Sequence, residues 1–217
     1  MRTRHFSSRT GPAGFSLVEL LAVIAIIALL AVLVTPAINS ISSGTSLTVS
    51  AATVTDTLNL ARQTALSKNR PVEVRFLKVP AVNRTVADGA GNFVYRAIAL
   101  YQISDADPME LSRIIYLQPN IQLADSDTFG TLIKYLPVST MPVRAIDPSG
   151  TTFSYSYFQF RPDGSTNLSP QAPTASGDAW HMMIYSANSP PQGSTPPKNY
   201  ITLQLDPLTG RTRTFQP

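Results

Sequence analysis

An acidic side chain near the start of a long apolar run is the most unusual chemical feature of this sequence. Glu19 precedes a stretch, Leu20 to Val34, in which no side chain is polar. About twenty apolar residues in a helix cross the hydrocarbon core of a bilayer, so 15–35 is predicted to be a transmembrane helix. An ionised side chain inside a bilayer costs about 3 kcal/mol on insertion scales and usually marks function. Glu19 therefore needs a partner.

The segment ahead of this run is a candidate export signal. The leader, residues 1–14, contains three arginines and no acidic residue, which predicts that it stays in the cytoplasm while the rest of the chain faces outward. The small-residue sequence after the apolar run, near 35–37, is a poor cleavage site. Cleavage between Gly14 and Phe15 fits the sequence better and would leave the span attached to the product.

The stretch from Gly14 to Leu21 resembles the class III signal of type IV pilins and type II secretion pseudopilins. Five features coincide: the basic leader, glycine before the cut, phenylalanine after it, glutamate at the fifth mature position and the long span. The resemblance implies that a prepilin peptidase cuts after Gly14 and methylates the new amine of Phe15. It also implies insertion in the inner membrane with a periplasmic ectodomain, and assembly with other pilins or pseudopilins through the N-terminal helices.

Glu19 and Pro36 have two interpretations each. In such filaments Glu19 is thought to pair with the Phe15 amine of a neighbouring subunit, which sets the axial register because an unpaired buried charge is costly. Alternatively, Glu19 interacts with its own chain's amine and with the helix dipole on the first turn. Pro36 either kinks the helix, as in many pilins, or ends it at the outer membrane face.

Two arginines near the carboxyl end form a candidate nucleic-acid site. Arg211 and Arg213 lie in a Gly-Arg-x-Arg sequence, and on a strand they would point to the same side and could contact successive phosphates. Resemblance to FimT-like minor pilins, in which such an ending is associated with DNA binding, implies the same role. Arginines on an edge strand also commonly just discourage aggregation. Without the three leader arginines the formal net charge falls from +4 to +1, which gives DNA binding no wider support.

Other chemistry has weaker signals. His181 is the only histidine outside the leader and lies in an apolar strand, which favours a packed imidazole over a catalytic base. No nucleophile motif, phosphate-binding glycine loop or diagnostic carboxylate pair is present, so we do not expect an enzyme or a cofactor. The chain has no cysteine. Two acidic groups do not have the spacing of a calcium loop, so solvated loop acids explain them better. These groups are Asp105, Asp107 and Glu110, and Asp125 and Asp127.

The elements that position these residues follow from periodicity. Six residues recur at spacings of three and four, which predicts one apolar stripe on an amphipathic helix, 36–70, that packs on a sheet and ends near Pro71. The stripe is Leu47, Ala51, Val54, Leu58, Ala61 and Ala65. Alternating or apolar runs separated by Gly, Pro, Asp and Ser turns predict strands. These strands are Val72–Phe76, parts of Phe93–Ile103, Ile114–Leu117, Phe153–Phe160, His181–Tyr185 and Tyr200–Leu205.

We therefore expect an α+β, pilin-like fold in which the N-terminal helix packs on an antiparallel sheet or small sandwich, 71–217. Three stretches resemble the GspH/FimT group of minor pseudopilins and minor pilins, and the chain also resembles pilin-like proteins of the Verru/Chthon cassettes. The three stretches are 61–72, 158–165 and 208–213. The segments 81–92 and 168–198 are longer than this group needs, and we expect the latter to be an exposed loop that faces a partner.

Overall fold

The computed structural model describes residues 16–82, 93–104, 107–143, 146–148, 150–174 and 178–217, and within this set it describes only the backbone of 31–43. The chain divides into two compact units, Met1–Ser42 and Ser43–Pro217. The second unit contains both sheets, and it is described here by itself.

Helix α1, Leu17–Lys68, has 52 residues, and its outer part carries the predicted apolar stripe. That prediction is confirmed, because every stripe residue from Leu47 to Ala65 is at most 4% exposed. The helix ends where the sequence indicated. Asn69 has a left-handed φ of 50°, and the Arg70 amide donates to the Ala65 carbonyl at 3.3 Å, a Schellman-type ending that Pro71 follows.

Sheet A is six-stranded and antiparallel, with the order β3-β2-β1-β7-β6, and β4 also pairs with β2. Its strands are β1 (Val72–Pro80), β2 (Phe93–Gln102), β3 (Met109–Glu110), β4 (Ile115–Tyr116), β6 (Val138–Pro142) and β7 (Thr152–Phe160). The central strand β1 is buried on both faces, since its first six residues are all buried.

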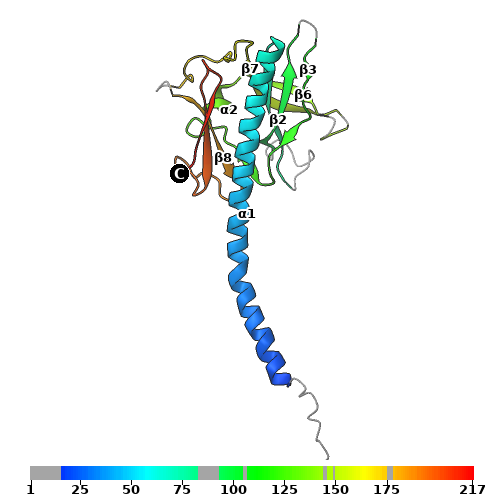
Figure 1. Ribbon diagram of the computed structural model, residues 1–217, viewed down its shortest axis with the longest axis vertical. Coiled ribbons are helices and arrows are strands. Elements are labelled where there is room, and N and C mark those ends of the chain that lie inside the picture. Colours follow the sequence, from blue (N-terminus) through cyan, green and yellow to red (C-terminus); the bar gives the residue numbers. More distant parts are fainter. Residues whose placement is uncertain (1–15, 83–92, 105–106, 144–145, 149, 175–177) are drawn as a thin grey trace, which may run out of the picture. The chain divides into compact units, whose positions relative to one another are not determined.

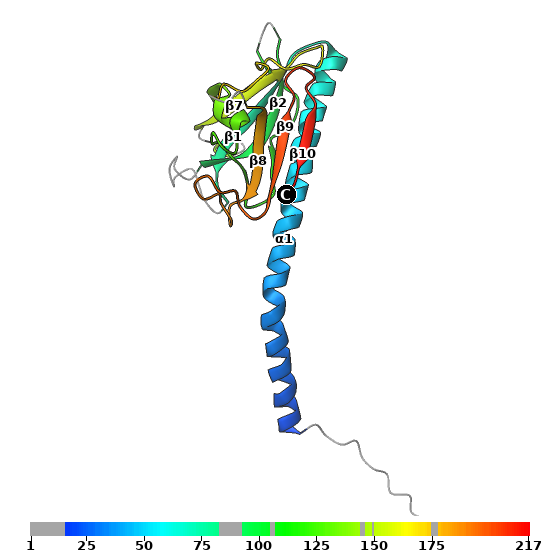
Figure 2. The same cartoon turned by 90° about the vertical axis from the view of Figure 1, so that its left-hand side faces the viewer.

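Sheet B is four-stranded and antiparallel, with the order β10-β9-β8-β5. Its strands are β5 (Ile121–Leu123), β8 (Trp180–Ser186), β9 (Tyr200–Leu205) and β10 (Thr212–Phe215), and the short helix α2 (Thr131–Tyr135) contacts β8. In Figure 1 the outer part of α1 runs across the ectodomain with β8 on one side of it and β3 and β6 on the other, and Figure 2 shows β10 as the strand of sheet B beside this helix.

One hydrophobic core joins the helix stripe to the inner faces of both sheets. It contains the stripe, Phe76 and Phe158 of sheet A, and Met182 and Leu203 of sheet B, all buried. A second, smaller cluster lies on the other face of sheet A and includes Leu77 and Phe153. Burial on two faces explains why the β1 sequence is mostly apolar rather than cleanly alternating.

The α+β prediction with antiparallel sheets is confirmed in outline, and so is each predicted strand; β9 has the predicted ends, and the other strands have at least one shifted end. The prediction of an exposed loop over 168–198 is wrong for its middle part. Strand β8 runs through it, and Ala172 and Trp180 are 3% exposed. The strand predicted at His181–Tyr185 is present in this segment as part of β8. The loop prediction relied on the Pro, Ser and Gly content of the whole segment, and composition averages over residues that differ in burial. The segment 81–92 lies mostly outside the described residues.

Candidate functional site

The start of α1 forms a reciprocal hydrogen-bonded cap. The Ser16 carbonyl accepts from the Leu20 amide at 3.2 Å, and the Ser16 hydroxyl accepts from the Glu19 amide at 3.2 Å. In return, Glu19 Oε2 accepts from the Ser16 amide at 3.1 Å and from its hydroxyl at 2.9 Å. This arrangement is a capping box, in which Ser and Glu three residues apart satisfy free amides of the first turn.

The capping box gives Glu19 a local role that the sequence analysis missed. The signal was available, because Ser-x-x-Glu directly precedes an apolar run. Only Oε2 is used. Among the described residues, Oε1 therefore has no hydrogen-bond donor. The predicted processing residues Gly14 and Phe15 lie outside the described residues.

The apolar stretch that follows is exposed within the part of the chain that the structure describes. Its large side chains, from Leu17 to Leu30, are between 48% and 80% exposed. Within the part of the chain that the structure describes, no helix combines the length and hydropathy that a membrane crossing requires. The predicted span 15–35 includes Phe15 and the side chains of 31–35, which lie outside the description. Helix α1 continues through Pro36, so the interpretation of Pro36 as a helix terminator is wrong.

The three stretches that carry the subgroup resemblance meet around one side chain, Arg62 of α1. Its Nε donates to the Gly164 carbonyl at 3.1 Å and to the Thr209 carbonyl at 2.8 Å. Gly164 lies in the turn after β7, and Thr209 lies in the turn between β9 and β10. We call this contact the Arg62 bridge. It ties the helix to a turn from each sheet, and the sequence analysis did not identify it.

Gly210 is required beside the Arg62 bridge. Its φ of 65° is left-handed, and a Cβ on this residue would lie 2.2 Å from the Gly164 carbonyl oxygen. The two turns are also joined directly, because the Thr166 amide and hydroxyl donate to the Pro207 carbonyl at 2.8 and 3.0 Å. The glycine of the Gly-Arg-x-Arg sequence thus has a structural role that does not depend on any ligand.

Arg211 and Arg213, the predicted DNA-binding residues, line one pocket of about 250 Å³ at the end of sheet B. Arg211 lies just before β10, and Arg213 lies within it opposite Gln204 of β9. Both side chains are exposed, and no salt bridge within the described residues involves either of them. The other residues that line the pocket are Pro170, Ala179, Trp180, Gln204, Leu205, Asp206 and Pro207. Two guanidinium groups in one pocket suit an anionic ligand.

Asp206 is the carboxylate in this pocket, and its oxygens face its own turn. Oδ1 accepts from the amides of Leu208 and Thr209, and Oδ2 accepts from the Thr209 hydroxyl at 2.8 Å. The Thr209 hydroxyl is the largest cause that holds the pKa of Asp206 below its ordinary value, and the charge of Arg213 adds to it. The carboxylate is committed to the turn, so it competes only weakly for the arginines.

His181 is half-buried on β8, outside the main core. Its Nδ1 lies 3.0 Å from the Ala179 carbonyl and 3.2 Å from Thr131 Oγ1, and its Nε2 lies 3.4 Å from the Thr128 carbonyl. The imidazole therefore packs against the segment that leads into α2. Among the described residues no cluster of three or more His, Asp or Glu side chains could hold a metal ion. Asp105 lies outside that set.

Residues 9–35 match the family described as the prokaryotic N-terminal methylation motif. No curated protein and no solved structure matches the chain. The matched residues include Gly14, Phe15 and Glu19, and the motif belongs to structural subunits rather than to an enzyme family. The predicted resemblance is confirmed: the chain carries the prepilin-type signal of type IV pilins and pseudopilins.

Proposed function

We propose that the chain is a minor pseudopilin or minor pilin that joins or primes a type II secretion pseudopilus or a type IV pilus-like filament. It has a leader (1–14), a transmembrane helix (15–35), an outer amphipathic helix (36–70) and a β-rich ectodomain (71–217). A prepilin peptidase removes the leader and methylates Phe15. The product is anchored in the inner membrane with its ectodomain in the periplasm.

The observation that carries this proposal is the match to the methylation motif over 9–35, a range that includes the predicted cleavage site and Glu19. The uncovered side chains between Leu17 and Leu30 support it, because an apolar surface of this kind needs lipid or other helices as a partner. The burial of the stripe between Leu47 and Ala65 supports it as well, since the ectodomain then needs no further cover along this helix.

Glu19 has a geometry that allows pairing between subunits. Its Oε2 is occupied by Ser16, whereas Oε1 accepts from no described residue and can receive the methylated Phe15 amine of a neighbour. The charge pair and the helix cap are therefore compatible, because they use different oxygens. A contact from the amine of one subunit to the carboxylate of the next is heterologous and extends into an open helix.

Mass spectrometry of the mature N-terminus tests the processing step. Co-expression with a prepilin peptidase is expected to yield a chain that begins with N-methylated Phe15. A chain that retains Met1 after co-expression would refute the proposal.

Two substitutions separate the charge of Glu19 from its capping role. Glu19→Gln keeps an acceptor for the capping box but removes the charge, and Ser16→Ala removes the cap but keeps the charge. We expect Glu19→Gln to abolish incorporation into filaments and Ser16→Ala to retain most of it, measured by the amount of subunit in sheared filament fractions. The opposite ranking would show that Glu19 acts as a cap only.

A second candidate function is nucleic-acid binding through Arg211 and Arg213. It is supported by their place in one pocket without a salt bridge to a described residue. The test is a salt-dependent shift of labelled DNA by the full chain that is lost on replacing both arginines with glutamine. Absence of any binding at low ionic strength would remove this function and leave the filament role intact.

A further inference from the structure

The outer face of sheet B combines aromatic and basic side chains in register. Arg213 and Phe215 are two residues apart on β10, so they lie on the same face of the sheet. Thr214 between them lines a groove with Thr48 and Ala51 of α1. Arg213 and Phe215 therefore lie on the face of sheet B that is turned away from the helix.

The residues across the strands extend this surface. Arg213 pairs with Gln204 and Phe215 pairs with Thr202 on β9, and Tyr200 follows two residues along β9 on the same face. Tyr200 in turn lies directly opposite Tyr185 of β8. We call Arg213, Phe215, Tyr200 and Tyr185 the outer-face residues of sheet B. Diagonal neighbours of this kind are about 7–8 Å apart, which is within reach of aromatic side chains.

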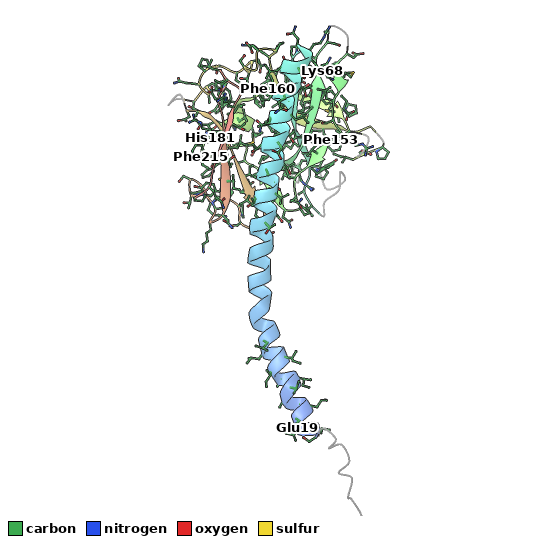
Figure 3. The ribbon with its side chains drawn as sticks, viewed as in Figure 1. Glu19, Lys68, Phe153, Phe160, His181 and Phe215 are labelled. Atoms are coloured by element: carbon green, nitrogen blue, oxygen red, sulfur yellow. The ribbon has the colours of Figure 1, made fainter. Side chains whose placement is uncertain are left out.

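The ring of Phe215 on β10 is exposed, and Tyr200 on β9 is half-buried. Phe215 is 52% exposed. None of the ring–ring or cation–ring contacts found among the described residues involves Phe215 or Tyr200. The β8 end is partly closed, because His181 packs against Thr128 and Thr131. Figure 3 places Phe215 and His181 on the sheet B side of the helix, with Phe153 on the opposite side.

The basic pocket adjoins these rings. Arg213 belongs to both the outer face and the pocket of about 250 Å³, to which Arg211 and Gln204 also contribute. A phosphate held by Arg213 in this pocket would lie near the ring of Phe215, which is two residues further along β10. Arginines beside exposed aromatic rings on a sheet are the combination that holds a phosphate backbone while bases stack on the rings.

We propose that the outer face of sheet B binds unpaired nucleotides, with bases stacked on Phe215 and Tyr200 and the adjoining phosphate held by Arg211 and Arg213. This proposal rests on the second candidate function and specifies its ligand. A duplex is a poorer match, because its bases are stacked on one another and cannot reach the rings. The affinity of a protein for duplex DNA also depends on many contacts between basic side chains and phosphates. Without its leader this chain has a formal net charge of only +1, which supplies few such contacts.

Fluorescence anisotropy of the full chain in detergent micelles tests the proposal, with fluorescein-labelled oligo(dT) and a DNA hairpin of equal phosphate number at low ionic strength. Phe215→Leu keeps an apolar side chain but removes the ring, and Phe215→Trp keeps a ring. We expect Phe215→Leu to weaken oligo(dT) binding about five-fold or more, and Phe215→Trp to retain it. Binding of the hairpin is expected to be weaker and unaffected by Phe215→Leu.

Charge variants separate the two proposals. The double variant Arg211→Gln and Arg213→Gln is expected to abolish oligo(dT) binding. The control is Arg113→Gln, which removes an exposed arginine from the loop before β4 and should bind oligo(dT) normally. Binding that depends on the arginines but not on Phe215 would overturn base stacking and leave nucleic-acid binding standing. Equal or tighter binding of the hairpin would also overturn it. No binding of either probe would remove nucleic-acid binding itself.

Discussion

Two stretches of α1 both carry many apolar side chains, but these side chains differ in burial. Between Leu17 and Leu30 the large apolar side chains are all exposed among the described residues, whereas between Leu47 and Ala65 one apolar stripe is buried. Lipid or other helices would satisfy exposed apolar side chains such as those of the first stretch, whereas the stripe of the second stretch is already buried. The difference lies in the periodicity: an all-round apolar helix has no solvent face, and a striped helix has one.

The largest expected change in the free energy of unfolding comes from a comparison of two leucines of α1. Leu58→Ala removes a side chain that is 1% exposed and should lower the free energy of unfolding by about 2–5 kcal/mol. Leu60→Ala removes one that is 49% exposed and should change it by less than about 0.5 kcal/mol. Trp180, the only tryptophan and 3% exposed, reports denaturant unfolding by fluorescence. Equal losses for the two variants would contradict the buried stripe.

The next largest effect is expected in the turn between β9 and β10, which contacts Arg62 of α1. Gly210→Ala should cost about 2 kcal/mol or more, because it adds a clash with the Gly164 carbonyl to the cost of a left-handed conformation. Gly193 is the control: its φ is 59°, but no atom lies within 4 Å of a Cβ there. Gly193→Ala should therefore cost only about 1–2 kcal/mol. The comparison fails if Gly193→Ala is the more destabilising variant in the same assay.

A smaller effect is expected from the Arg62 bridge. Arg62→Ala leaves the Gly164 and Thr209 carbonyls without this charged donor and should cost about 1–2 kcal/mol. Arg70→Ala, which removes an exposed arginine just after the helix, should be within about 0.5 kcal/mol of the unmodified chain. Thermal unfolding followed by circular dichroism provides the measurement. If Arg62→Ala left the stability unchanged, packing alone would hold the helix against the two turns.

The smallest effect tests the first stretch. Ile27 is 59% exposed, so Ile27→Ala should leave the unfolding free energy of the ectodomain unchanged within about 0.5 kcal/mol in detergent. Urea titration followed by Trp180 fluorescence measures it. A loss as large as that for Leu58→Ala would show that this stretch packs within its own chain, and the contrast between the two stretches would disappear.

Sequence alone determined the features that depend on neighbouring residues. The period of the stripe predicted the buried face of α1, the proline after Arg70 predicted its end, and alternation predicted most of the longer strands. The signal from Gly14 to Glu19 was also readable, because processing depends on a short contiguous segment. What the sequence analysis overlooked locally was the Ser16–Glu19 capping box, although its spacing was visible.

Tertiary structure decided the features that join distant residues. Arg62 contacts Gly164 and Thr209 across separations of 102 and 147 residues, and no local pattern fixes such a pairing. The register of β9 and β10, which sets Arg213 beside Gln204 and Phe215 beside Thr202, depends on the same long-range packing. Strand β3 has only two residues, too few for a periodic signal, and β6 (Val-Ser-Thr-Met-Pro) has five residues of which none is buried. Both form because a neighbouring strand offers unpaired backbone groups.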